Sequence, residues 1–136
     1  AKAGATPLNA VLDYAETITQ PGLNFMDTPG YDPVSATGQI AGGAQLIVFT
    51  TGRGSAFGSK PAPTIKLATN DALFHAMCED MDLNCGDILS AAVTLENKAR
   101  EIVALIIANA SGQPSKSEEL GLGDNEFVPW QIGAVL

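Results

Sequence analysis

Cysteine and aromatic residues are scarce in this sequence. Its 136 residues include only two cysteines, Cys78 and Cys85, whose spacing matches neither the disulfide framework of a secreted domain nor a CxxC zinc or redox motif. A reducing compartment therefore fits the cysteine content best. Aromatic residues make up 6% of the chain, but apolar residues make up 46%. That apolar fraction is sufficient for one hydrophobic core, and it excludes intrinsic disorder.

Basic residues are also few. The chain carries 7 Lys and Arg against 15 Asp and Glu, which gives a formal net charge of -8. The basic residues form no stripe, so a nucleic-acid backbone and an anionic lipid surface are excluded as partners. Long hydrophobic runs are absent as well, because the longest, residues 102–108, is far too short to span a bilayer. We therefore expect a cytoplasmic protein that binds neither nucleic acid nor membrane.

Turn and capping signals divide the chain into alternating helices and strands. Apolar residues recur at helical spacing after Thr6-Pro7, which predicts a helix over residues 7–17. Further helices are predicted over residues 34–41, 71–81 and 95–110, and strands over residues 23–27, 45–50, 64–68 and 83–85. The strand at residues 45–50 is β-branched and aromatic, which is typical of a strand buried on both faces of a parallel sheet.

Helix caps support this division. Asp32, Asn70 and Thr94 each precede a predicted helix and are predicted to cap it. The last helix is expected to bury one apolar stripe, formed by Leu95, Ala99, Ile102, Val103, Ile106 and Ala110. Strands that alternate with helices through mostly short connections imply a mainly parallel sheet covered on both faces. We therefore predict one domain over residues 1–136, a three-layer Rossmann-like α/β fold.

A glycine-rich segment directly after the strand at residues 45–50 is the strongest candidate site. It contains Thr51, Gly52, Arg53, Gly54 and Lys60, and parallel sheets bind ligands where their strands end. Glycines let backbone amides approach an anion, and the arginine offers a two-pronged donor for a carboxylate. The alternative is a plain glycine-rich connection with two solvated basic residues. The glycine spacing departs from GxGxxG by one residue, which disfavours a dinucleotide site.

Two more polar residues follow predicted strands. Asp27 ends the strand at residues 23–27 and is expected to open onto the same sheet edge, where it could hold a metal or orient a ligand hydroxyl. The alternative for Asp27 is that it begins a turn. Asn70 follows the strand at residues 64–68 and could also reach the mouth of the site, although capping the next helix is its more favoured role. His75 has no convincing metal-ligand partner nearby in sequence.

Several ordered blocks of the sequence resemble one known family. They are Pro21–Pro33, Thr50–Gly58, Pro63–Asn70, Met81–Gly86, Ala110–Gly112 and Phe127–Gly133. Together they look like the C-terminal region of the galactarate and altronate dehydratases. Proteins of that family are longer, so the resemblance implies that this chain is the C-terminal domain of a longer enzyme and is inactive alone.

The resemblance implies a hydro-lyase that removes water from a sugar acid and gives a 2-keto-3-deoxy acid. It further implies a divalent metal, Fe²⁺ or Mn²⁺, in the full-length enzyme, and N-terminal and central regions of the same protein as partners. We expect this domain to bind the substrate carboxylate through Arg53, Lys60 and the neighbouring amides, and we expect a homodimer. The family includes a sulfolactate sulfo-lyase subunit, so that activity stays open, as does a non-catalytic acid-binding or assembly role.

Overall fold

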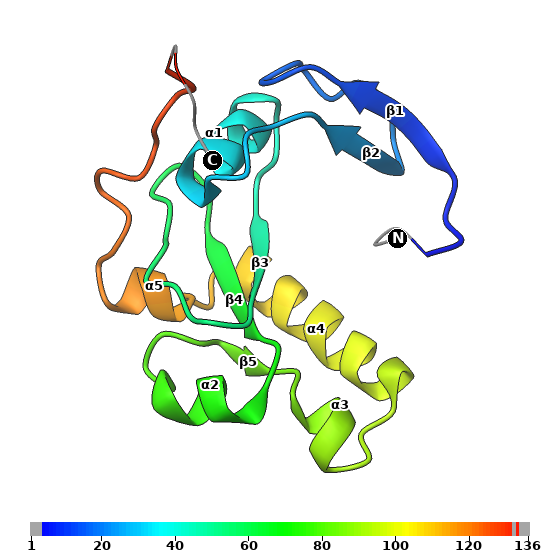
Figure 1. Ribbon diagram of the computed structural model, residues 1–136, viewed down its shortest axis with the longest axis vertical. Coiled ribbons are helices and arrows are strands. Elements are labelled where there is room, and N and C mark those ends of the chain that lie inside the picture. Colours follow the sequence, from blue (N-terminus) through cyan, green and yellow to red (C-terminus); the bar gives the residue numbers. More distant parts are fainter. Residues whose placement is uncertain (1–3, 132, 134–136) are drawn as a thin grey trace. The chain divides into compact units, whose positions relative to one another are not determined.

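The computed structural model describes residues 4–131 and residue 133. Figure 1 shows short strands alternating with helices along the chain. The elements in chain order are β1 (Leu8–Leu12), β2 (Leu23–Met26), α1 (Asp32–Ala41), β3 (Ile47–Thr51), β4 (Thr64–Ala68), α2 (Asp71–Ala76), β5 (Leu83–Asn84), α3 (Asp87–Ser90), α4 (Leu95–Ala110) and α5 (Lys116–Glu119). Over the described part of the chain, no helix has the length and apolar character that crossing a membrane requires.

The described strands form two small parallel sheets, which belong to two compact units. Residues 1–45 and 125–136 make the first unit, and residues 46–124 make the second. The first unit holds the sheet β1-β2, and the second holds the sheet β3-β4-β5. The fold class is therefore α/β with parallel strands, as predicted, and is consistent with a Rossmann-like arrangement. The single sheet expected from the sequence is replaced by two.

In the first unit, β1 corrects a prediction. Residues 8–12 form a strand that pairs in parallel with β2, with Val11 opposite Phe25, so the helix predicted over residues 7–17 is wrong. The apolar spacing there also fits a short strand, and pairing with β2 satisfies its backbone groups. Just beyond the strand, Ala15 adopts a left-handed φ of 62°, which no α-helix accommodates.

The helix α1 begins close to where the sequence placed it. Tyr31 takes the N-cap position without a side-chain cap bond, and Asp32 is the first helical residue. The prediction that Asp32 caps the helix is therefore wrong by one residue. Gly38 lies so close to the Tyr14 ring that a Cβ there would overlap it, and the Tyr14 hydroxyl donates to the Val34 carbonyl at 2.8 Å. Tyr14 thus holds α1 within this unit.

The second unit is built around β4, the central strand of its sheet. All five residues of β4 are buried, and Ala68 packs with Leu73 and Met81 in the core. The strand β3 was predicted to be buried on both faces, but only Ile47 of β3 is fully buried, and Val48 is 38% exposed. Its position at the edge of the sheet explains the difference.

Helix capping in the second unit follows the prediction. The Asn70 side chain accepts a hydrogen bond from the Leu73 amide, and Thr94 does the same for Asn97. The helix α2 is shorter than predicted and ends at Ala76.

The apolar stripe of α4 is the larger correction. Leu95 is 74% exposed and Val103 53%, whereas Lys98 and Asn109 are buried. The inward face of α4 therefore carries Lys98 and Asn109 beside the half-buried Ile102 and Ile106 of the predicted stripe.

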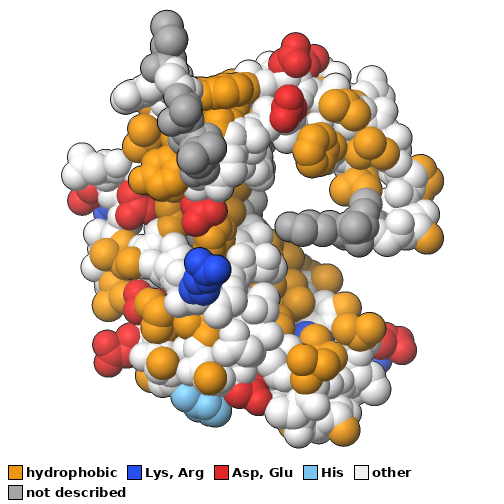
Figure 2. Space-filling view, viewed as in Figure 1, with side chains coloured by type: hydrophobic (Ala, Val, Ile, Leu, Met, Phe, Trp, Pro, Cys, Tyr) orange, Lys and Arg blue, Asp and Glu red, His pale blue; other side chains and the backbone are white. Residues whose placement is uncertain are grey.

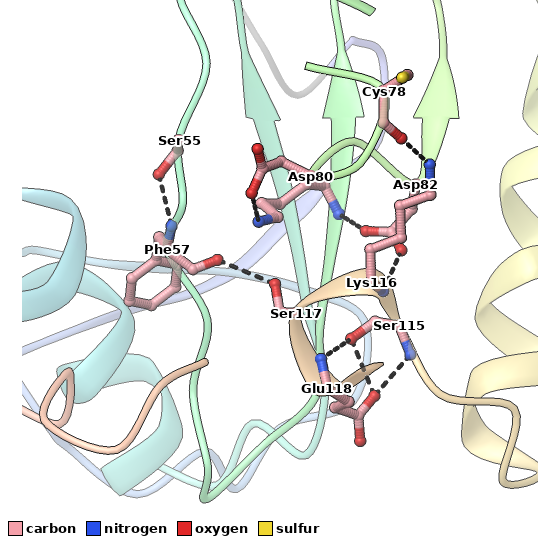
Figure 3. Close-up of polar contacts among 10 residues, drawn as sticks. Ser55, Phe57, Cys78, Asp80, Asp82, Ser115, Lys116, Ser117 and Glu118 are labelled. Atoms are coloured by element: carbon pink, nitrogen blue, oxygen red, sulfur yellow. Dashed lines mark hydrogen bonds and ion pairs between the residues drawn. The ribbon is translucent and has the colours of Figure 1, made fainter. Parts of the chain in front are cut away.

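Hydrogen bonds connect α5 to the side of the sheet where β5 begins (Figure 3). The Lys116 amide donates to Asp82 Oδ1 at 2.8 Å, and the Lys66 amide donates to Asp82 Oδ2 at 2.6 Å. The Ser117 hydroxyl donates to the Phe57 carbonyl at 3.2 Å. One carboxylate thus joins β4 to α5, and the loop after β3 is held to the same helix. These contacts lie at the edge of the sheet where β5 begins, opposite to the edge where the strands end.

Candidate functional site

The ends of β3, β4 and β5 lie along one edge of the second sheet, and hydrogen bonds connect them. The Thr69 hydroxyl donates to the Thr51 carbonyl at 3.1 Å, and Asn70 Nδ2 donates to the Gly52 carbonyl at 3.1 Å. Both bonds join the end of β4 to the end of β3. Helices α2 and α3 begin just beyond the ends of β4 and β5 (Figure 1). Ligands of parallel α/β proteins bind at this edge of a sheet.

The first turn of the glycine-rich segment is closed by Thr51. Its hydroxyl accepts hydrogen bonds from the Gly54 amide at 3.1 Å and from the Arg53 amide at 3.4 Å. These two amides are therefore engaged within the loop and do not point freely at an anion. An anion bound at this loop would therefore be held mainly by the Arg53 side chain.

Close packing requires a residue without a side chain at Gly54. Its φ is +100°, and a Cβ at this position would overlap the Met77 sulfur and lie 3.1 Å from Leu73 Cδ1. The loop therefore lies directly against α2 and the residue that follows it. Packing alone accounts for Gly54, whether or not the loop binds a ligand.

Arg53 is exposed at this edge. Within residues 4–131 and 133 its side chain makes no hydrogen bond or ion pair. Figure 2 shows that basic side chains are isolated from one another on the viewed face. A guanidinium without an internal carboxylate partner can offer its full two-pronged donor to a carboxylate from solution.

The structure does not bring Lys60 or Asp27 to the same edge. Lys60 lies close to the start of β4 and pairs with Asp124 at 3.5 Å, where both side chains are largely exposed. It therefore lies toward the opposite edge of the sheet. Asp27 follows β2, which pairs with β1 in the other unit. The prediction that Asp27 opens onto the same sheet edge as Arg53 is therefore wrong.

A buried lysine beyond the end of β5 was missed in the sequence. Lys98 of α4 is 3% exposed, and its ammonium lies 2.8 Å from Asp87 Oδ2 and 2.5 Å from Glu101 Oε2. Burial alone would lower the pKa of Lys98, but hydrogen bonds from its ammonium to these two carboxylates raise it above the ordinary value. Burial raises the pKa of the nearby Cys85 thiol. We call Cys85, Asp87, Lys98 and Glu101 the Lys98 cluster.

The Lys98 cluster adjoins the end of β4. A Cβ on Gly86 would overlap the Asp71 amide and lie 2.6 Å from Asn70 Cα, so the backbone before Asp87 packs directly on the residue that caps α2. A sequence signal for Asp87 was present, because residues 83–85 were predicted to be a strand and polar residues after parallel strands mark sites. Lys98 gave no such signal, because a lysine near Glu96, Asn97 and Arg100 on a helix is typical of a solvent-exposed face.

A second buried lysine does not belong to this edge. Lys66 is fully buried in β4, and its ammonium lies 3.9 Å from Asp80 Oδ1. A ligand therefore has no access to Lys66.

Asn84, at the end of β5, makes two local hydrogen bonds. Its Nδ2 donates to Asp71 Oδ1 at 2.7 Å, and its Oδ1 accepts from the Gly86 amide. Both ends of the Asn84 amide are therefore used within the domain.

The described residues do not fit a complete metal site. Among residues 4–131 and 133, no group of three or more His, Cys, Asp and Glu side chains is placed so that it could hold a metal ion. The divalent metal expected from the resemblance would therefore need further ligands.

Comparison with known sequences identifies the family. Residues 1–135 match the sequence model described as D-galactarate/altronate dehydratase, C-terminal. The chain belongs to this family. The resemblance predicted from the ordered sequence blocks is confirmed, and it extends over nearly the whole chain.

Three curated relatives illustrate the range of the family. The chain is 39% identical to altronate dehydratase of Bacillus subtilis over 82% of its length, and 36% identical to galactarate dehydratase (L-threo-forming) of Escherichia coli over 90%. It is 32% identical over 89% of its length to the (2R)-sulfolactate sulfo-lyase subunit beta of Chromohalobacter salexigens. The matches span only 22%, 24% and 31% of these relatives, respectively. Proteins named as dehydratases and as a sulfo-lyase subunit thus share similarity with this chain.

Proposed function

We propose that this chain is the substrate-carboxylate-binding domain of a hydro-lyase that dehydrates a sugar acid of the galactarate or altronate type. Its relatives are named as dehydratases of such acids. The observation that carries the proposal is Arg53, which is exposed at the ligand-binding edge of a parallel sheet and has no carboxylate partner within the described residues.

The reaction explains why a cation is needed at this edge. Dehydration of a hydroxy acid removes a weakly acidic proton next to the carboxylate and expels the hydroxyl one carbon further along. Negative charge then develops on the carboxylate as it becomes an enediolate, and a fixed cation stabilises that charge. A guanidinium that binds both carboxylate oxygens also fixes the orientation of the adjacent C–H bond.

The direct test replaces Arg53 in the full-length protein that carries this domain. Arg53→Ala should lower kcat/KM for the sugar acid by roughly 10- to 100-fold, because charged hydrogen bonds contribute about 1.5–3 kcal/mol each. Lys60→Ala is the matched control, since it removes an equal charge from a paired, exposed position of the same segment. Arg53→Ala kinetics equal to those of the wild type would refute the assignment.

The substrate is to be determined with the same protein. Galactarate, altronate and glucarate would be tested for release of a 2-keto acid, and sulfolactate for release of sulfite. Sulfite release is the second candidate activity, favoured by the similarity to the sulfo-lyase subunit. Both reactions are eliminations next to a carboxylate, so Arg53 has the same role in each.

We further propose that the remaining requirements of the enzyme lie outside this chain. The family members are longer, and other regions would supply metal ligands for Fe²⁺ or Mn²⁺ and complete the active site, so the isolated chain would be inactive. A cytoplasmic homodimer is the proposed state. Leu95, Val103 and Ile107 are exposed on α4 and favour a further contact there.

A pure assembly role is the non-catalytic alternative, and ligand binding separates it from the proposal. Sugar acid should raise the unfolding temperature of the chain saturably if the domain binds carboxylate. Self-association without any such shift would favour assembly.

A further inference from the structure

Asp87 has an oxygen whose hydrogen-bonding capacity is not used. Its Oδ2 accepts from the Lys98 ammonium at 2.8 Å, but Oδ1 is buried and has no hydrogen-bond partner in the described part of the chain. A buried acceptor without a donor is costly and is rare in folded proteins. The side chain as a whole is 25% exposed, although Oδ1 itself is shielded from solvent, so Asp87 borders the protein surface through its other atoms. A ligand that binds beside this carboxylate would supply the missing donor.

Asp87 and Arg53 lie along the same sheet edge. Gly86 packs on Asn70, and Asn70 donates to Gly52 at 3.1 Å, so these contacts run from the end of β5 to the end of β3. Adjacent strands are about 4.8 Å apart, which places the two strand ends about 10 Å from each other. Side chains from both ends can therefore reach one small substrate between them.

We infer that Asp87 is the general base that removes the proton next to the substrate carboxylate while Arg53 holds that carboxylate. This inference rests on the proposed function. The Asp87 carboxylate takes the proton, and the C–H electron pair moves into the substrate carboxylate to give the enediolate. That electron pair then forms a C=C bond as the hydroxyl on the next carbon leaves. Protonation of that hydroxyl by a general acid from elsewhere in the enzyme releases water. The resulting enol tautomerises to the 2-keto-3-deoxy acid, and no oxidant or reductant is consumed.

The Lys98 cluster is suited to such a proton transfer. When Asp87 becomes protonated it loses its negative charge, and the buried Lys98 ammonium would be left without a counter-charge if Asp87 were its sole partner. Glu101 lies 2.5 Å from the same ammonium and keeps it paired. Lys98 is therefore a positioning residue that fixes the Asp87 carboxylate throughout the reaction.

Other candidates at this edge are less suited to act as the base. Hydrogen bonds from Ser90 and Asn84 lower the pKa of Asp71, which makes it a weaker base. Burial raises the pKa of the Cys85 thiol, so this thiol stays protonated and gives no base at neutral pH. Glu101 projects from α4, its side chain is half exposed, and it is not next to a strand end.

The experiment compares Asp87→Asn with Glu101→Gln in the full-length protein. Both variants remove one negative charge that contacts Lys98, and both keep the shape of the side chain. A merely structural role through Lys98 predicts similar effects from the two. A base at Asp87 predicts a loss of kcat of about 10²- to 10⁴-fold in Asp87→Asn with KM little changed, and a far smaller loss in Glu101→Gln, which removes only a group that supports Lys98. Exchange of the substrate α-proton in D₂O should be lost in parallel.

The outcomes separate this inference from the proposed function. Wild-type turnover of a sugar acid together with equal kinetics of the two variants would overturn the role of Asp87 and leave the proposed function intact. A rise in KM without loss of kcat in Asp87→Asn would also overturn it, because Asp87 would then only bind a hydroxyl. A wild-type enzyme with no lyase activity would overturn both. Circular dichroism and thermal unfolding of each variant exclude misfolding as the cause.

Discussion

Removal of the buried Lys98 charge should destabilise the chain far more than removal of an exposed lysine. Lys98→Met keeps most of the aliphatic stem but deletes the ammonium that lies 2.8 Å from Asp87 and 2.5 Å from Glu101. Two carboxylates then lose their cation in a partly buried setting.

The magnitude follows from the exposure of the three groups. Breaking a buried ion pair by removing one partner costs about 3–5 kcal/mol. Water reaches the carboxylates here, since their side chains are 25% and 50% exposed, so the cost falls to the lower limit of that range or below it. We expect a loss of about 2–3 kcal/mol in the free energy of unfolding of the second unit.

The assay is urea unfolding of the chain, followed by circular dichroism, with Lys60→Met as the matched control. Lys60 pairs with Asp124 at 3.5 Å, and the two side chains are 54% and 73% exposed, so its removal should change stability by less than about 0.5 kcal/mol. A lower unfolding midpoint at unchanged slope reports lost stability. Equal midpoints for the two variants would refute the reasoning.

The pH dependence gives a second check on the same variant. The folded-state pKa of Lys98 lies above its ordinary value of 10.5. A raised lysine pKa contributes stability that is fully present below the unfolded value and is lost as the pH rises through the folded value. The stability difference between wild type and Lys98→Met should therefore be constant near neutral pH and shrink above pH 10.5. A difference that grew with alkalinity would contradict this sign.

Three further predictions concern packing and acid stability. Gly54→Ala should lower the free energy of unfolding by about 2–4 kcal/mol, because the new Cβ would overlap the Met77 side chain. Gly112 has nearly the same φ but open space around it, so Gly112→Ala should lower it by only about 1 kcal/mol. Calorimetry of both variants measures the difference. Met81→Ala, at 0% exposure, should cost about 2–5 kcal/mol, and Ile107→Ala, at 60%, less than about 0.5 kcal/mol by urea unfolding. Burial alone would raise the pKa of Glu118, but hydrogen bonds to its carboxylate lower it, so its stabilising effect is lost as the pH falls through that lower value. Glu118→Gln should consequently show a flatter loss of stability in acid.

Local signals in the sequence were sufficient to predict several strands and helix caps of the second unit. The strands at Thr64–Ala68 and Leu83–Asn84 and the caps at Asn70 and Thr94 occur where they were predicted. Each depends on interactions within a few residues: β-branched side chains favour extended backbone, and short polar side chains bond to the first turn of a helix. The position of Arg53 after a strand was predicted for the same reason, although its role at a carboxylate stays a prediction.

The sequence by itself determined the family, the α/β class, and both ends of β4 and α4 in the second unit. Only the tertiary structure decided which strands share a sheet, and therefore that Asp27 and Arg53 follow strands of different sheets. It also decided that β1 is a strand and that α4 buries Lys98 while Leu95 stays exposed. Helical periodicity identifies an apolar stripe, but burial depends on which side chains distant elements present to it. Asp87 meets Lys98 across eleven residues of chain, and such a contact leaves no mark on local spacing.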